Sequence, residues 1–386
     1  MEAINEIFAA YGTYINIAIG AAVFILFTVF RNKLASLLLG ITGKIIFAKY
    51  PQRRQGYKNS IMHPVAIYFI VLGLFLGIII NYNHTIIRDT FKIVSVTSAV
   101  DSGKATFDTM INCTPYPVPG SRPVTDAPRS YGGLTVAGVL KKSSNPGAFR
   151  IALKSGWPTY KKYFDLYGFS SKTGIDLPGE TNSQCQDGSN FVNFSRISFG
   201  YSLMVSPLQV AMAYAAIAND GVRMRPRLVD GIYVDDRNFQ PSPPVEVCRV
   251  MSVKTARDLR NALFHVTDLD GTAKRARIEG YNVGGKTGTA HKVKPTGGYF
   301  ENRYTVSFVG MLPVEDPAFV CLVVIDDPTS KHCHPGGGSV CAPVFQKLAT
   351  RLAAAMNIPK NSPSAEANKK ASRAQASSTP SKPPRR

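Results

Sequence analysis

The sequence predicts an α+β fold for the larger part of the chain, preceded by an all-α hairpin. Three segments, 283–290, 304–311 and 319–325, are strand-like and joined by loops, which is typical of an antiparallel sheet. Earlier segments carry apolar residues at helical spacing. Two long apolar spans lie before residue 82, and such spans predict a pair of transmembrane helices.

Residues 1–82 are predicted to form a membrane hairpin. The spans Tyr14 to Phe30 and Pro64 to Ile80 hold no charged residue and are about long enough to cross a bilayer. The loop between them is basic, which the positive-inside rule places in the cytoplasm. Acidic Glu2 and Glu6 precede the first span, so a cleavable signal peptide fits less well. A buried helical hairpin of a soluble domain is the alternative.

The helices of the next part are predicted from apolar spacing and end signals. The clearest start is Ser206-Pro207-Leu208-Gln209, with Ser206 as N-cap, Pro207 at the first helical position and Gln209 completing a capping box. Asn219-Asp220-Gly221 ends this helix. Further helices are expected over 91–99, 134–142, 157–167 and 344–355.

The chain is strongly basic, with a formal net charge of +20 over 386 residues. Much of this charge lies beside the apolar spans and in the segment 358–386, which is Ser, Ala, Pro, Lys and Arg with few apolar residues. That segment is predicted to be a disordered tail. No nucleic-acid motif is present and aromatics are not interleaved with the basic clusters, so nucleic acid is not an expected partner.

The cysteines and histidines do not predict a metal centre. None of the six cysteines lies in Cys-x-x-Cys spacing, and His332-Cys333-His334 is the one local cluster of ligand type. It precedes Pro335-Gly336-Gly337-Gly338 and is interpreted as a turn, because a tetrahedral site needs spaced ligands from two elements. No metal and no cofactor is expected. Disulfide pairing stays open.

Two copies of Lys-Thr-Gly occur in the chain. One lies in Gly284-Gly285-Lys286-Thr287-Gly288-Thr289-Ala290 and the other at Lys172-Thr173-Gly174. Small residues in a strand allow another backbone to approach closely, and a lysine supplies positive charge for a carboxylate. Three residues alone are a weak signal, so the context decides between the copies.

The context is an ordered series of motifs that resembles the transpeptidase domain of class B penicillin-binding proteins, from about Thr90 to Asn357. The motifs are Ser143-Ser144-Asn145, the loop 171–180, Ser198-Phe199-Gly200-Tyr201, Ser206-Pro207-Leu208-Gln209, Gly285 to Ala290, Ser307-Phe308-Val309-Gly310 and the segment 337–345. The resemblance implies an antiparallel-sheet serine-transpeptidase (β-lactamase-like) domain over 83–357. It also implies that Lys172-Thr173-Gly174 is structural and that Lys286 marks the active-site strand.

The resemblance implies nucleophilic catalysis. In this family a serine activated by a lysine attacks the D-Ala-D-Ala end of a peptidoglycan stem peptide, or a β-lactam, and an amine of another stem resolves the acyl-enzyme. By motif, the catalytic group would comprise Lys92 as base, Ser143 and Asn145 as second motif, and Lys286 as electrostatic partner. Substrate binding would fall to Ser144, Thr287, Gly288 and Thr289, with the Thr289 amide as half of an oxyanion hole.

This chain departs from the family at the nucleophile. Asp89 stands where the serine is expected, and no serine in the chain has a lysine three residues later. Barely eight residues separate the second apolar span from Asp89, so the pedestal domain and the first strands of the family's sheet have no counterpart. The sheet is therefore expected to lack its first strands and to keep an unpaired edge.

These observations predict a membrane-anchored protein of peptidoglycan synthesis with impaired acyl transfer. Its location would be the bacterial cytoplasmic membrane, with the domain after residue 82 on the extracytoplasmic side. Expected partners are a stem peptide or β-lactam, the membrane, and division or elongation proteins. The alternatives are a transpeptidase using other groups, a non-enzymatic scaffold, and a rearranged gene fragment. A β-lactamase fits the loop motifs and the membrane anchor less well.

Overall fold

The computed structural model describes residues 89–177, 180, 182–235, 238–294, 298–329 and 335–360. The chain divides into two units, residues 1–79 with 294–297 and residues 80–293 with 298–386, and the account below concerns the second. The predicted membrane hairpin, the cluster His332-Cys333-His334 and the tail from residue 361 lie outside the described residues. No helix within the described residues is long and apolar enough to cross a membrane.

The first half of the described chain is mainly helical. Its elements are α4 (Lys92–Asp101), β1 (Met110–Asn112), β2 (Gly133–Thr135), α5 (Val136–Lys142) and α6 (Asn145–Leu166). Thr135 caps α5 by accepting a hydrogen bond from the Gly138 amide, and Ser144 caps α6 in the same way through Gly147. The segment predicted as a separate helix over 157–167 is the second part of α6, which kinks at Gly156 just before Pro158.

The middle of the chain joins three helices through short strands. Its elements are β3 (Gln184–Cys185), α7 (Phe191–Ile197), β4 (Leu203–Met204), α8 (Pro207–Ala218), β5 (Val222–Met224), β6 (Gly231–Asp235), β7 (Asn238–Pro241), β8 (Glu246–Arg249) and α9 (Val253–Phe264). The predicted capping box is confirmed, because the Gln209 amide donates to Ser206 Oγ at 3.1 Å and the Ser206 amide donates to Gln209 Oε1 at 2.9 Å. This sequence signal therefore fixes the start of α8.

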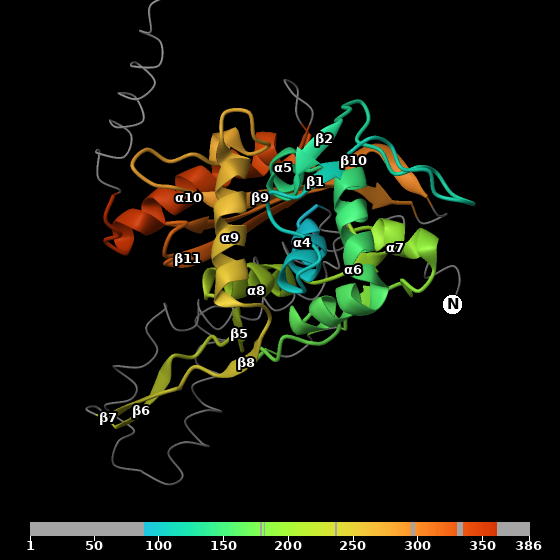
Figure 1. Cartoon of the computed structure of the whole chain (residues 1–386). Coiled ribbons are helices and arrows are strands. Elements are labelled where there is room, and N and C mark those ends of the chain that lie inside the picture. Colours follow the sequence, from blue (N-terminus) through green and yellow to red (C-terminus); the bar gives the residue numbers. More distant parts are fainter. Residues whose placement is uncertain are drawn as a thin grey trace, which may run out of the picture. The chain divides into compact units, whose positions relative to one another are not determined.

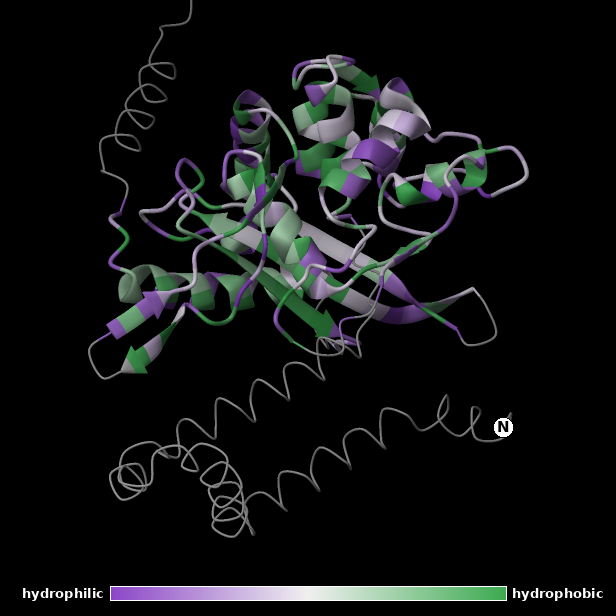
Figure 2. Ribbon diagram, turned by 90° about the horizontal axis from the view of Figure 1, so that it is seen from below, coloured by the Kyte–Doolittle hydropathy of each residue, from purple (hydrophilic) through white to green (hydrophobic). Residues whose placement is uncertain are grey.

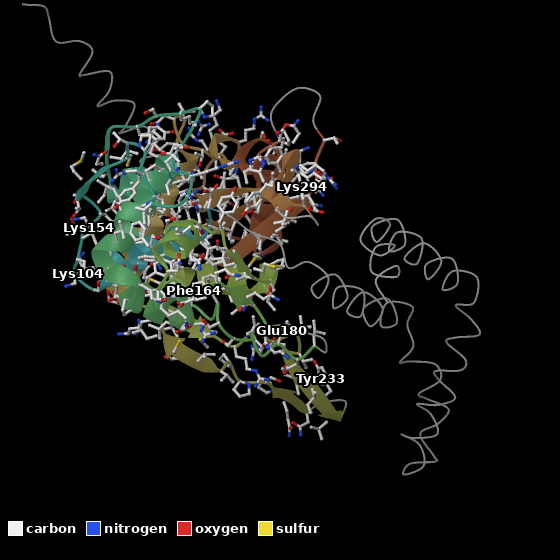
Figure 3. All side chains as sticks on the ribbon, turned by 90° about the vertical axis from the view of Figure 1, so that its right-hand side faces the viewer. Lys104, Lys154, Phe164, Glu180, Tyr233 and Lys294 are labelled. Atoms are coloured by element: carbon white, nitrogen blue, oxygen red, sulfur yellow. The ribbon has the colours of Figure 1, made fainter. Side chains whose placement is uncertain are left out.

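The ribbon of β6 and β7 projects from the rest of this unit (Figure 1). Several of its hydrophobic side chains are exposed, and Tyr233, labelled in Figure 3, is 71% exposed. Hydrophobic and hydrophilic residues are mixed along the ribbon, at the lower left of Figure 2.

The principal sheet has three antiparallel strands in the order β11-β10-β9. These are β9 (Gly284–Val293), β10 (Tyr299–Leu312) and β11 (Phe319–Asp326), and they confirm the three predicted strands. Two short 3-10 helices, η2 (His265–Thr267) and η3 (Lys274–Ala276), precede β9. After β11 a π-helical turn, η4 (Gly337–Cys341), leads into the final helix α10 (Ala342–Ala355).

Each face of the sheet packs against its own hydrophobic core. On one face, Val309 and Met311 of β10 join the core made by the helices before the sheet. On the other face, Phe308 packs against Phe345 of α10 with ring centroids 4.9 Å apart. Helix α4 is buried from Lys92 to Ala99, and Figure 1 shows it in the middle of the unit, near α6 and α9. Its side chains are therefore held by packing on all sides.

Candidate functional site

Lys92 lies in the first turn of α4 and is fully buried. Its amine forms an ion pair with Asp89 Oδ1 and donates to the hydroxyl of Ser143, with Nζ 3.0 Å from Oγ. Asp89 has a positive φ of 70°, an uncommon backbone conformation for a residue with a side chain. The two residues at the predicted base and nucleophile positions are thus in direct contact.

Ser143 lies in the tight turn between α5 and α6. Its φ of 60° is left-handed, and its amide donates to the Leu140 and Val139 carbonyls at the end of α5. This turn brings Oγ to 2.8 Å from the amine of Lys286 on β9. Lys286 is also fully buried and donates to the Thr287 carbonyl at 3.1 Å. One hydroxyl therefore accepts hydrogen bonds from two buried lysines on different elements.

Lys141 and Lys142, at the C-terminal end of α5, form ion pairs next to this turn. Both are ion-paired with Asp270, and Lys141 also contacts Asp268. The hydrogen bond from Lys141 to Asp270 raises the pKa of Lys141. Basic residues also suit the negative end of a helix. These contacts tie the residues before Ser143 to the loop that follows η2.

Ser144 and Asn145 are held by a loop that sequence reasoning did not single out. Asp126 accepts a hydrogen bond from Ser144 Oγ at 2.6 Å through Oδ2 and one from the Asn145 amide at 2.6 Å through Oδ1. Asn145 Nδ2 donates to the Thr125 carbonyl at 3.1 Å. The only sequence signal was an isolated acidic residue in a Pro- and Gly-rich loop. Such a residue is uninformative until its partners are known.

The predicted substrate-binding role of Ser144 stays a prediction. Its side chain is fully buried and caps α6. Burial also raises the pKa of the neighbouring Cys113 thiol, so that group stays protonated at neutral pH. Asn145 is 6% exposed, and its Oδ1 is buried with no hydrogen-bond partner among the described residues. An unsatisfied buried carbonyl is costly, so this oxygen is suited to accept a hydrogen bond from a ligand.

The free edge of β9 forms another side of the site. Residues on an antiparallel strand alternate in the direction of their backbone groups. The hydrogen bond from the Asp327 amide to the Tyr304 carbonyl shows that the backbone groups of Tyr304 face the side of β11, so those of the next residue of β10 face β9. With the register of β10 on β9, this alternation turns the backbone N–H and C=O of Thr287 and Thr289 away from β10. An extended ligand could pair with them.

Two threonine side chains on β9 have partners that the sequence did not predict. Thr287 Oγ1 lies 3.1 Å from Thr272 Oγ1, and the Gly337 amide donates to Thr289 Oγ1 at 3.2 Å. Gly337 packs so closely that a Cβ there would lie 2.1 Å from the Ser307 carbonyl. Glycine is therefore required where η4 meets the sheet.

The other Lys-Thr-Gly copy lies in a loop folded around a carboxylate. The amides of Thr173 and Gly174 donate to Glu180, at 2.7 and 3.2 Å, and Arg225 donates to the Gly174 carbonyl at 2.8 Å. These contacts satisfy three backbone groups of the loop. In the described part of the chain, no group of three or more His, Cys, Asp or Glu side chains could hold a metal ion.

The assembled site holds a hydroxyl between two amines, an arrangement that allows proton transfer among the three groups. The Lys92 amine also contacts the carboxylate of Asp89. The Asp89 amide donates to the Phe199 carbonyl at 3.0 Å. In serine acyl transferases the nucleophile's own amide commonly helps to bind the oxyanion, whereas the amide at the predicted nucleophile position of this chain is occupied by the Phe199 carbonyl.

Comparison with known proteins places this site in a family. Residues 90–350 match the model of the penicillin-binding protein transpeptidase domain. PbpB of Mycolicibacterium smegmatis is 32% identical over 279 residues, which cover 69% of this chain and 43% of that protein. The peptidoglycan D,D-transpeptidase FtsI of Escherichia coli K12 is 33% identical over 271 residues, 70% of this chain and 44% of that protein. The chain thus spans less than half the length of these relatives.

Solved structures give the same result. The transpeptidase domain of penicillin-binding protein 3 from Burkholderia pseudomallei has a TM-score of 0.64 and 34% identity, covering 72% of this chain and 81% of that one. Penicillin-binding protein 3 of Mycobacterium tuberculosis in complex with ampicillin has a TM-score of 0.64 and 29% identity, covering 71% of this chain and 63% of that one. With the lysines, the serine turn and the strand edge in one place, the chain belongs to the penicillin-binding protein transpeptidase family.

Proposed function

We propose that this chain is a membrane-anchored member of its family that binds D-Ala-D-Ala stem peptides and β-lactams without forming an acyl-enzyme. One observation carries the proposal. Lys92, Ser143 and Lys286 form one hydrogen-bonded network, with Asp89 at the position of the nucleophile. The network supplies contacts for a ligand, whereas the group that would attack a carbonyl is replaced.

Asp89 is a poor substitute for a serine. Its carboxylate is ion-paired with Lys92, and an ion pair lowers the reactivity of a carboxylate towards a neutral amide. Attack by a carboxylate would give an acyl anhydride in place of an ester. Carboxylates act as nucleophiles in other enzyme classes, but the product here would need different chemistry for its release.

Ligand recognition is supported by the strand edge and by the relatives. The backbone groups of Thr287 and Thr289 face an open edge, where an extended peptide could add as a strand. Structures of the Mycobacterium tuberculosis relative in complex with ampicillin and with aztreonam show β-lactam binding by that protein. In this chain Lys286, Thr287 and Thr289 would bind the ligand's carboxylate, and Asn145 Oδ1 would accept from its amide.

The membrane anchor and location are part of the same proposal. The two apolar spans before residue 82 and the basic loop between them would hold the domain at the outer face of the bacterial cytoplasmic membrane. Protease protection in membrane vesicles of known orientation tests this arrangement. Digestion of the domain in right-side-out vesicles supports it, and digestion only in inverted vesicles contradicts it.

A second candidate is a scaffold without ligand turnover or binding, acting with division or elongation proteins. The hydrogen bond between the Asp89 amide and the Phe199 carbonyl favours it, because that donor is already occupied. A scaffold would keep the fold and lose affinity for β-lactams.

A fluorescent penicillin separates these candidates. The full chain, purified in detergent, should show saturable fluorescence anisotropy that unlabelled ampicillin competes away, but no fluorescent band after denaturing electrophoresis. Lys286→Ala should weaken binding about tenfold or more, since it removes a charge-assisted contact. Absence of competable binding by the unchanged protein would favour the scaffold. A covalent band that disappears when the protein is boiled first would overturn the inactivity proposal.

A further inference from the structure

Strand β11 lies at the outer edge of the sheet within the described residues. It runs for 8 residues, pairs with β10 on one side, and has no strand on the other. Its segment from Phe319 to Ile325 is entirely uncharged, and Asp326 closes the strand. Edge strands usually carry charged residues, prolines or bulges that prevent pairing with other chains. β11 carries none of these before its last residue.

The hydrogen-bonding groups on the outer edge of β11 can be assigned. Asp327 donates to the Tyr304 carbonyl, and the register of β10 on β11 is regular from Thr305↔Asp326 to Leu312↔Phe319. Alternation along the strand then directs the backbone groups of Val320, Leu322 and Val324 away from β10. The edge therefore offers the donors and acceptors that a further strand would need.

The burial of β11 differs from that of its neighbour. The apolar residues of β11 from Phe319 to Ile325 are all partly exposed, whereas Val306, Phe308 and Val309 of β10 are fully buried. Yet both faces of β11 contact a core. Val320, Leu322 and Val324 pack against the core of the helices before the sheet. The alternate residues, starting at Phe319, pack against the core beneath α10. A strand with apolar contacts on both faces is typical of a sheet interior. The two cores thus extend to the edge, and no described strand covers them there.

The space beside β11 is hollow. A cavity of about 670 Å³ lies between α8, the middle of α9 and the beginning of β11. Its lining includes small or flexible side chains of α8, namely Ala211, Met212 and Ala215, together with Phe319 and Val320. Arg257 and Arg260 of α9 also line it, and both are paired with Asp220. On the helix that covers the other face, Val344 and Leu348 are 44% and 41% exposed. Apolar surface is therefore available for side chains of an added strand.

Charge distinguishes between possible occupants. Glu315 and Asp316 are exposed before β11, and the described residues form no ion pair with them. Asp326 and Asp327, at the other end, are paired with Lys292 and Arg303. Antiparallel pairing of β11 with a second copy would bring Glu315 and Asp316 near an end whose carboxylates are already paired, so the charges of Glu315 and Asp316 would stay uncompensated. A basic residue at the end of the added strand would instead complement Glu315 and Asp316.

We propose that β11 accepts a strand from another protein chain, and that this strand is an extended apolar segment with a basic residue at the end that lies beside Glu315 and Asp316. Main-chain hydrogen bonds to Val320, Leu322 and Val324 would provide affinity. Apolar side chains alternating towards α8 and α10 would provide specificity, as in other cases of strand addition to a sheet edge. The added strand would extend the sheet and cover the two exposed core margins.

The test uses the full chain in detergent and a defined probe. The probe is a fluorescein-labelled peptide, Lys-Lys-Val-Thr-Val-Ile-Val-Thr-Val-Lys, and its control is the same peptide with alternate amides N-methylated to remove hydrogen-bond donors. Leu322→Pro removes an outward amide, and proline is tolerated on the solvent side of an edge strand. Leu322→Ala is the matched control, because it removes the same side chain and keeps the amide.

We expect saturable binding of the probe by the unchanged chain and by Leu322→Ala. Leu322→Pro should weaken binding about tenfold or more, because a main-chain hydrogen bond is lost and its partner is left unsatisfied. Neither the unchanged chain nor Leu322→Ala should bind the control peptide, in which the amides that would face β11 are N-methylated. Absence of saturable probe binding by the unchanged chain, or equal binding by the two variants, would overturn the proposal.

Hydrogen exchange provides a second readout that needs no variant. In the free chain the amides of Val320, Leu322 and Val324 should exchange faster than those of Cys321 and Val323, which point to β10. Added probe should slow the first group selectively. If sedimentation shows a dimer that Leu322→Pro dissociates, a second copy is the occupant and the proposed heterologous partner is wrong.

Discussion

The amine of Lys286 lies 2.8 Å from the hydroxyl oxygen of Ser143, across 143 positions of sequence. Lys286 lies near the start of β9, and Ser143 comes from a turn between two helices. The same hydroxyl accepts from Lys92 at 3.0 Å. Since both lysines are fully buried, the network depends on the packing of α4, α5 and β9 together. Asp89, at the predicted nucleophile position, contacts the Lys92 amine of the same network.

Replacing Asp89 by serine should restore covalent reaction with penicillin. Asp89→Ser would place a hydroxyl beside the Lys92 amine, which is the arrangement that activates a serine nucleophile. A fluorescent penicillin should then give a band that survives denaturing electrophoresis. Asp89→Ala is the control and should give none. If Asp89→Ser folds and binds the penicillin but stays unlabelled, a further part of the machinery, such as the amide of residue 89, is also impaired.

Removing the charge of Asp126 should destabilise the turn that carries the site. Asp126→Asn weakens two charge-assisted hydrogen bonds, to Ser144 and to the Asn145 amide. We expect a loss of about 2 kcal/mol, or a fall in Tm of roughly 4–8 °C for a domain of this size. Thermal unfolding followed by circular dichroism measures it. Asp108→Asn, on an exposed loop, is the matched control, and an equal shift in the two variants would contradict the assigned role.

Shortening Phe308 should open a cavity between the sheet and α10. Phe308 is fully buried against Phe345, and Phe→Ala changes in cores typically cost about 3–5 kcal/mol. Phe308→Ala should therefore lower the midpoint of denaturant unfolding substantially. Phe239→Ala, where the ring is 42% exposed, should have a much smaller effect. Similar midpoints for both variants would show that α10 does not pack on β10 as described.

The charge of Asp101 should contribute to the stability of the domain, and this contribution should be lost in acidic solution. Burial raises the pKa of Asp101, but hydrogen bonds from the Ser252 amide and the Tyr163 hydroxyl outweigh it and leave the pKa below its ordinary value of 3.8. A lowered pKa in the folded state means that ionised Asp101 stabilises the fold above about pH 4, and that this contribution is lost as pH falls through the folded pKa.

Asp101→Asn should therefore have a lower Tm than the unchanged chain at pH 6. The difference should narrow as the pH falls below about 4 and the native carboxylate takes up its proton. Thermal scans at several pH values measure it. A difference that stays constant over this range would show that the hydrogen bonds do not depend on the charge of Asp101.

Much of the fold could be predicted from local patterns. The capping box of Ser206 and Gln209 fixed the start of α8. A small-residue run, an alternating segment and a continuous apolar run predicted the three strands of the sheet. Local patterns suffice here because caps and strand periodicity act between neighbours in sequence. Local patterns predicted a helix over 157–167 but not the part of α6 before it, because the kink at Gly156 divides the helix into two parts.

The sequence by itself indicated the family, which the match to residues 90–350 confirms, and it predicted the site motifs and the replacement at Asp89, since each is a matter of residue order. The tertiary structure alone decided that Ser143 lies between two lysines, that Asp126 holds the turn, and that Thr272 and Gly337 contact the active-site strand. These are contacts between segments far apart in the chain. Their energy comes from burial and hydrogen bonding in the packed state, which a linear pattern does not encode.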